Sequence, residues 1–281
     1  QRVARFRAGA EDGALLLLAE HARVRRVRAG YRLLHPQEPI RHVYLVLEGS
    51  VRWSRKGEPH QVAERHQAVG WIALMAREEG VEAVAETSTL VLELPADILE
   101  HSLEDHFAIT RNLLRLGASY LVDLRSGLPA AAGQAPPAQP GVKRAAKRTL
   151  VERVMGMRSA PIFKRASVEA VIALARSWQE VRIAPGDDLW GAGDDATFWV
   201  LVEYGRIRCS AGDRHVDVGA GFVLGILDAI GQLPRSYGAR AETEVIGSRI
   251  DLEGFLGVLE THFDLAREFV AYLARTALDG G

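Results

Sequence analysis

The chain has 281 residues but only one cysteine, Cys209, so it cannot form a disulfide within itself. Reduced thiols are typical of proteins kept in a reducing compartment, and we therefore expect a cytoplasmic protein. Cys209 follows Arg208 in a segment that alternates like a strand. A packed thiol is the simpler interpretation there, because no sequence signature of a partner base accompanies it.

Long apolar runs and a charge imbalance are also missing. The longest apolar run near the N-terminus, residues 14–19, is too short to span a bilayer and has no small-residue cleavage site, which predicts neither a membrane anchor nor a signal peptide. Thirty-five basic residues stand against 36 acidic ones, for a formal charge of -1. This balance gives no global electrostatic footprint for nucleic acid or an anionic membrane.

The signatures of enzymes are missing as well. The nine histidines are scattered without a His-x-His pair, and one cysteine cannot make a Cys-x-x-Cys pair. Neither the G-x-S-x-G elbow of hydrolases nor the GxxxxGK[ST] phosphate loop occurs. We therefore expect no catalytic residues and no metal site, and we keep a metalloenzyme on a jelly roll only as a distant third hypothesis.

One segment breaks the globular pattern. Residues 126–147 contain four prolines among alanine and glycine, with no apolar periodicity. Such a segment cannot offset its ordering entropy by burial. We interpret it as a linker between two domains, residues 1–125 and 148–281.

The two sides of this linker match each other at a constant offset of 156 residues. The matched markers are two glycines, a tripeptide and a His-Phe pair: Gly30 with Gly186, Gly49 with Gly205, Ala85-Glu86-Thr87 with Ala241-Glu242-Thr243, and His106-Phe107 with His262-Phe263. Four markers in one register favour an internal duplication.

Each half reads in the same order. An apolar helical run opens it (residues 15–22 and 168–178), short alternating segments follow, and a longer helical stretch closes it (107–124 and 263–278). Gly49 and Gly205 separate two strand signals, where a tight turn needs a residue that tolerates positive φ. The predicted fold class is mainly β with flanking helices: two antiparallel β-roll or jelly-roll domains, each with N- and C-terminal helices.

Four motifs of the second half carry a family resemblance: PGDDLW (185–190), YGRI (204–207), GFVLG (221–225) and PRSYGARAET (234–243). With them the chain resembles a tandem of the cyclic-nucleotide-binding domains found in catabolite activator proteins and in cAMP-dependent kinase regulatory subunits. The resemblance covers nearly all of both halves outside the linker. It implies a phosphate-binding cassette, in which a Gly-Glu pair opens a short helix and Pro-Arg follows about nine residues later.

The second cassette, residues 225–236, keeps this spacing but not all of its chemistry. The resemblance assigns candidate ligand contacts to Gly225, Ile226, Leu227, Arg235 and Ser236, with Arg235 in the place of the phosphate-binding arginine. Ile226 occupies the position of the glutamate that would accept a hydrogen bond from the ribose. Losing that charged hydrogen bond costs about 1.5–3 kcal/mol, or roughly tenfold to a hundredfold in affinity.

Arg235 has two interpretations at this point. It is either a surviving phosphate anchor or a partly exposed arginine paired with an acid such as Asp228 or Glu242. The first cassette, residues 70–79, departs further: after Gly70, Trp71 replaces the glutamate and Glu79 replaces the arginine. A carboxylate repels a phosphate, so the first half should bind neither cAMP nor cGMP.

Two hypotheses follow. The favoured one is a non-enzymatic regulatory or scaffold protein whose two degenerate domains contact protein partners and hold no cofactor. The alternative is a sensor that binds a cyclic mono- or dinucleotide in the second domain through Arg235. No helix-turn-helix follows the last helix before Gly281, so we predict no direct DNA binding. The closing helices could pair within one chain as a pseudo-dimer, or between two copies as a homodimer.

Overall fold

The computed structural model describes residues 20–55, 57–125, 127–129, 149–159, 161–163 and 165–279. Most of the predicted opening helix 15–22 and of the linker 126–147 lies outside these residues. The chain divides into a first unit, Gln1–Leu113 with Val270–Asp279, and a second unit, Leu114–Phe269 with Gly280–Gly281. The closing helices α5 (Phe107–Leu124) and α10 (Phe263–Leu278) therefore each begin in one unit and end in the other.

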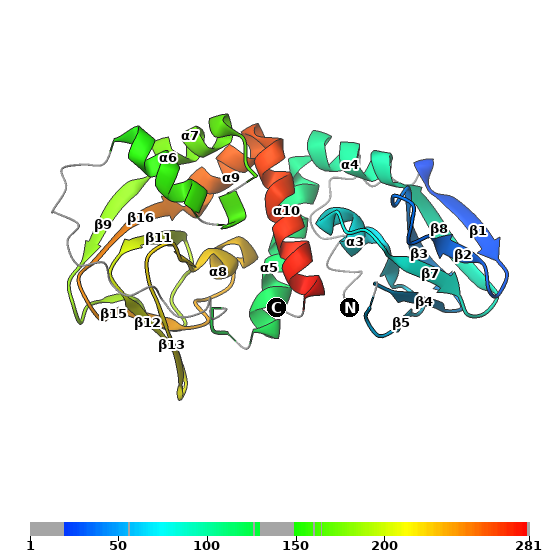
Figure 1. Cartoon of the computed structure of the whole chain (residues 1–281), viewed down its shortest axis with the longest axis horizontal. Helices are drawn as coiled ribbons and strands as arrows, with labels where there is room; N and C mark the ends of the chain where they lie inside the picture. The colour runs from blue at the N-terminus through cyan, green and yellow to red at the C-terminus, as the bar shows by residue number, and fades with distance from the viewer. Residues whose placement is uncertain are drawn as a thin grey trace. The chain divides into compact units, whose positions relative to one another are not determined.

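The first unit is built on two antiparallel sheets, ordered β1-β8-β3-β6 and β2-β7-β4-β5 (Figure 1). Side chains that alternate along the strands face inward, and Val46, Val51 and Val91 are fully buried between the sheets. Its elements are β1 (Arg23–Val27), β2 (Arg32–Leu34), β3 (His42–Glu48), β4 (Val51–Ser54), β5 (Gln61–Ala63), β6 (Ala68–Val69), α3 (Trp71–Ala76), β7 (Glu82–Ala85), β8 (Thr89–Pro95) and α4 (Ala96–Asp105).

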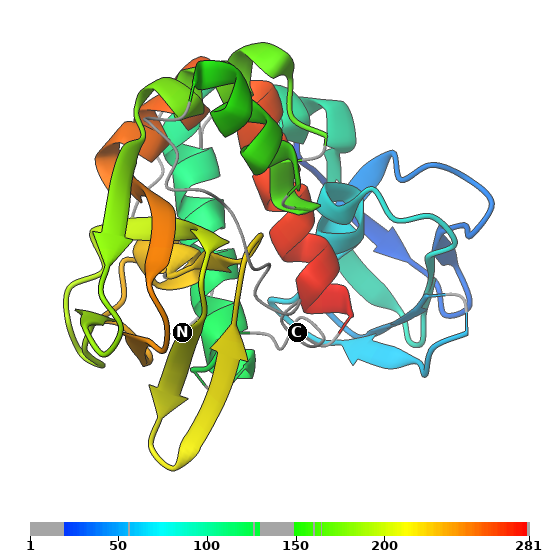
Figure 2. The ribbon, with the colours of Figure 1, turned by 60° about the vertical axis from the view of Figure 1, so that its left-hand side comes forward.

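The second unit has the same strand order, β9-β16-β11-β14 and β10-β15-β12-β13. Its β12–β13 hairpin projects from the unit in both views (Figure 1 and Figure 2). Its elements are α6 (Leu150–Ser159), a 3₁₀ turn (Pro161–Phe163), α7 (Val168–Arg176), β9 (Gln179–Ile183), β10 (Asp188–Trp190), β11 (Phe198–Tyr204), β12 (Ile207–Ala211), β13 (Arg214–Val218), β14 (Val223–Leu224), α8 (Ile226–Gly231), β15 (Gly238–Ala241), β16 (Val245–Asp251) and α9 (Leu252–Thr261).

The predicted fold class is confirmed, as are both closing helices, whose bounds agree with the predicted 107–124 and 263–278. The run that opens the second half begins at the predicted Val168, because the Ser167 side chain accepts a hydrogen bond from the Ala170 N–H (3.2 Å). The helix ends at Arg176 rather than at the predicted Trp178. Trp178 is nevertheless buried.

The repeated markers have a shared structural role. Gly49 and Gly205 adopt positive φ angles of 82° and 91°. Beside each turn, the repeated threonine accepts a hydrogen bond from the backbone N–H that follows the glycine: Thr87 from Ser50 (3.3 Å) and Thr243 from Arg206 (3.0 Å). The glycine and the threonine therefore recur together because they build the same turn.

The core of the second unit is aromatic. Trp199 and Phe269 are fully buried, and the Phe255 ring lies 5.5 Å and 5.0 Å from their centroids. Cys209 is also fully buried in this unit, and burial raises the pKa of its thiol to about 12. The packed-thiol prediction is confirmed. Within the described part of the chain, no helix is long and apolar enough to cross a membrane.

Candidate functional site

The second cassette opens at the start of α8. Gly225 is the N-cap residue of this helix, with a left-handed backbone at φ 74°. Its N–H donates to the Tyr237 hydroxyl (2.9 Å), and its carbonyl accepts from the Ala229 N–H (3.1 Å). Ile226, in the position of the missing glutamate, is only 7% exposed. A buried alkyl side chain therefore fills the place where a ribose acceptor was expected.

Arg235 points into the protein and not toward solvent. Only 2% of the surface of Arg235 is exposed. Nη1 donates to the Gly225 carbonyl (3.0 Å) and Nη2 to the Phe198 carbonyl (2.5 Å). The guanidinium carbon also lies 4.0 Å from the ring centroid of Trp190 and 4.8 Å from that of Phe198. Two carbonyl oxygens and two ring faces thus surround the charge that could have bound a phosphate.

The alternative of a partly exposed arginine paired with an acid is wrong. Arg235 is buried, and its hydrogen bonds go to carbonyl oxygens. Asp228 instead accepts from Ser236 (2.8 Å), and Glu242 forms an ion pair with Arg208 (3.3 Å). Arginine fits this position because its planar, weakly hydrated guanidinium can stack on aromatic rings while donating in its own plane.

Burial dominates the electrostatics of this cassette. It lowers the pKa of Arg235 and raises the pKa values of Asp228 and Tyr237. Asp228 Oδ2 and Arg235 Nε are buried without a hydrogen-bond partner among the described residues. The charged forms of both side chains are therefore penalised in the folded protein.

Ser236 links the cassette to the chain segment after α5. Its hydroxyl lies 2.8 Å from the Gly127 carbonyl and 2.8 Å from Asp228 Oδ1. One hydroxyl has one hydrogen and can donate to only one of these acceptors at a time. If Asp228 is protonated, it can donate to Ser236, which is then free to donate to Gly127. The raised pKa of Asp228 favours this arrangement.

Asp228→Asn is expected to stabilise the protein at neutral pH, by about 1 kcal/mol or more, because the amide donates to Ser236 without a buried charge. The folded-state pKa of Asp228 is raised. Its contribution to stability is therefore full below the unfolded-state pKa and is lost as pH rises through the folded-state pKa. The gain should appear above this window and shrink in acid. Urea unfolding across pH measures it, with Asp213→Asn, at an exposed position, as the control. A gain that is equal at all pH values would contradict the assignment.

The first cassette has a glutamate, Glu79, where the second has Arg235. Gly70 is the left-handed N-cap of α3 at φ 88°, Trp71 is partly buried and Glu79 is exposed. Leu34 and His42 stand, at the repeat offset, where the second unit has Trp190 and Phe198. Both line a small cavity beside the β2–β3 loop. The first unit therefore lacks the Trp–Phe pair, Trp190 and Phe198, on whose rings Arg235 lies in the second unit.

Sequence reasoning missed the residues that hold Arg235. Trp190 and Tyr237 stand inside the motifs PGDDLW and PRSYGARAET but received no role, and Phe198 lay outside every motif. The available signal was an arginine among aromatic positions, which is a common cation–π arrangement. Leu227, the remaining candidate contact, is partly buried on α8.

Part of the chain matches a known family of domains. Residues 24–106 match the family model of the cyclic nucleotide-binding domain. The predicted resemblance is confirmed. No curated protein matches the chain. Within the described residues, no group of three or more His, Cys, Asp or Glu side chains could hold a metal ion.

Several solved structures containing cyclic nucleotide-binding domains are similar to the chain. The regulatory domain of Toxoplasma gondii protein kinase A, crystallised with cAMP, is 15% identical with a TM-score of 0.39, over 98% of this chain and 92% of that chain. The regulatory subunit of a cAMP-independent protein kinase A from Trypanosoma brucei is 14% identical with a TM-score of 0.39, over 96% and 85%. A cyclic nucleotide-binding-like protein from Brucella abortus is 26% identical with a TM-score of 0.35, over 39% and 98%.

Proposed function

We propose that the chain is a non-enzymatic regulatory protein that acts through contacts with protein partners and no longer binds a cyclic nucleotide. It would consist of two cyclic-nucleotide-binding-like domains, 1–125 and 148–281, joined by the linker 126–147. It would work in the cytoplasm. The observation that carries the proposal is the inward orientation of Arg235, which is buried and bonded to two backbone carbonyls.

The energy of turning Arg235 outward supports the proposal. To meet a phosphate, the guanidinium would have to leave the Gly225 and Phe198 carbonyls and both ring faces. A hydrogen bond to a charged group contributes about 1.5–3 kcal/mol, so the two together weaken phosphate binding by roughly a hundredfold or more. The absent glutamate at Ile226 adds to this deficit.

The first cassette supports the same proposal. Glu79 is an exposed carboxylate in the place of the phosphate-binding arginine, and Trp71 replaces the ribose acceptor. Neither cassette therefore offers both groups that the family uses for a cyclic nucleotide. A β-roll without this ligand chemistry can still present a surface to a protein partner.

Calorimetric titration of the full chain with cAMP, cGMP and cyclic dinucleotides tests this proposal. We expect no binding at micromolar concentrations. Ile226→Glu, which restores the ribose acceptor, should not create micromolar binding either, because Arg235 stays turned inward. Saturable micromolar binding by the unaltered chain would overturn the proposal. Micromolar binding by the Ile226→Glu chain alone would show that Arg235 can turn outward to meet a phosphate. It would refute our explanation that the inward orientation of Arg235 prevents binding.

The alternative function is a cyclic mono- or dinucleotide sensor that uses Arg235. It is favoured by the spacing from Gly225 to Pro234-Arg235, which agrees with the family cassette. The same titration decides between the two functions. Pairing of the closing helices, within one chain or between two copies, remains a prediction.

A further inference from the structure

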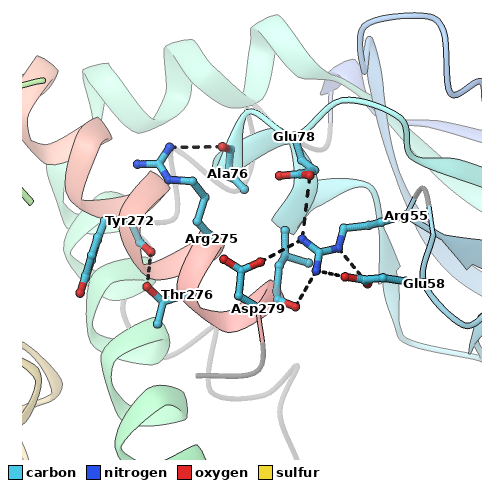
Figure 3. Close-up of polar contacts among 9 residues, drawn as sticks. Arg55, Glu58, Ala76, Glu78, Tyr272, Arg275, Thr276 and Asp279 are labelled. Atoms are coloured by element: carbon cyan, nitrogen blue, oxygen red, sulfur yellow. Dashed lines mark hydrogen bonds and ion pairs between the residues drawn. The ribbon is translucent and has the colours of Figure 1, made fainter. Parts of the chain in front are cut away.

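The carboxyl end of α10 belongs to the first unit and contacts α3, within the first cassette, and the β4–β5 hairpin. Arg275 Nη1 donates to the Ala76 carbonyl at the end of α3 (3.4 Å). Arg55, in the β4–β5 hairpin, donates through Nη2 to the Leu278 carbonyl (2.9 Å) and through Nη1 to Asp279 Oδ1 (3.3 Å). Figure 3 shows these contacts converging on the last turn of the helix.

Arg55 is the cation that makes the contacts to Leu278 and Asp279. Its side chain is only 10% exposed, and it is hydrogen-bonded to Glu58 through Nε (2.9 Å). Glu78 lies 3.9 Å from Nη1, so three carboxylates and a helix carbonyl approach one guanidinium (Figure 3). The carbonyl end of a helix carries partial negative charge. Without Arg55, this group of acceptors would repel one another.

The same helix end also buries apolar surface. Val270, Ala271 and Leu273 are at most 8% exposed, and at the end of α3 Met75 and Ala76 are at most 9% exposed. Residues 270–279 therefore combine buried apolar side chains with a polar anchor at Arg55. Asp279, at the outer end, keeps 72% of its side chain exposed.

We propose that the end of α3 and the β4–β5 hairpin form a docking surface for the acidic carboxyl end of a helix, which residues 270–279 occupy as an intramolecular strap. A protein partner that uses this surface must displace the strap with a helix of the same chemistry: apolar on one side and ending in free carbonyls beside a carboxylate. This inference rests on the proposed function and names where that function is controlled.

Hydrogen exchange of residues 270–279 in the full chain tests the strap. Arg55→Ala should accelerate exchange of the last two turns of α10 by tenfold or more, whereas Arg52→Ala, which removes an exposed arginine of the same hairpin, should leave it unchanged. Asp279→Lys should also accelerate exchange. Because the Asp279 side chain is exposed, a general folding defect would not explain this acceleration. Unaltered protection in both Arg55→Ala and Asp279→Lys would overturn the strap.

A labelled peptide with the sequence of residues 263–279 tests the docking surface. It should bind the Asp279→Lys chain, in which charge repulsion weakens the strap and Arg55 is retained, and bind the unaltered chain at least tenfold more weakly. A peptide carrying the same Asp279→Lys change should not bind. Equal binding to both chains, or binding to neither, would overturn the docking surface. Nucleotide binding in the calorimetric titration would instead overturn the proposed function and leave these results unchanged.

Discussion

Gly225→Ala is expected to lower the free energy of unfolding of the second unit by about 3–5 kcal/mol. At φ 74° a β-carbon is strained, and here it would overlap Nη1 of Arg235 and lie 3.1 Å from both Cζ of Arg235 and Cη2 of Trp190. The guanidinium would have to leave the Gly225 carbonyl, so backbone strain and a lost charged hydrogen bond add together. Chemical denaturation, resolved by hydrogen exchange of second-unit amides, measures the loss.

Gly193→Ala separates the two contributions. Gly193 has a more positive φ of 91°, but nothing lies within 4 Å of the β-carbon position. Its substitution should therefore cost only the left-handed backbone strain, about 1–2 kcal/mol. If the two alanine variants lost equal stability, the close contact between Gly225 and Arg235 would have no energetic consequence.

The elements that local patterns determine could be predicted from the sequence. The closing helices have an apolar stripe at helical spacing, and the turn glycines recur with the threonines that bond beside them. The repeat markers fall on equivalent turns and helix boundaries of the two units. Strand order was not predicted, because pairing between distant strands leaves little local signal.

The orientation of Arg235 could not be predicted in the same way. Spacing places a residue in the cassette, but whether its side chain turns outward or inward depends on partners far along the chain. Those partners are Trp190 and Phe198, which precede it by 45 and 37 residues and belong to different strands. The missing glutamate at Ile226 was the available indication that the cassette had changed.

The contact between Arg55 and α10 could not be predicted from the sequence, for a related reason. Its hydrogen bond to Leu278 joins residues 223 positions apart, and Arg55 lies in no motif of the family. The sequence predicted that both closing helices exist, but helical periodicity does not say which surface receives the end of each helix. The division of α5 and α10 between the two units was therefore not foreseen.

Arg235→Ala is expected to lower the free energy of unfolding by about 3–5 kcal/mol, because it removes a large buried side chain and leaves two carbonyls without its donors. Relief of the buried charge, seen in the lowered pKa of Arg235, offsets part of this loss. Arg235→Met keeps most of the volume without the charge, and should lose about 1–2 kcal/mol. Denaturant unfolding of the three chains distinguishes packing from charge.

Arg249→Ala is the matched control, because Arg249 lies 3.9 Å from the centroid of the same Phe198 ring but keeps 35% of its side chain exposed. It pairs with Asp251 at the surface, so its loss should cost less than about 1 kcal/mol. A phosphate anchor that projected from the cassette would behave like Arg249, with little effect on stability and a large effect on nucleotide binding. An arginine that has become part of the core shows the reverse. If Arg235→Ala and Arg249→Ala lowered the free energy of unfolding by equal, small amounts, the alternative function would be favoured: a sensor that binds its ligand in the second cassette.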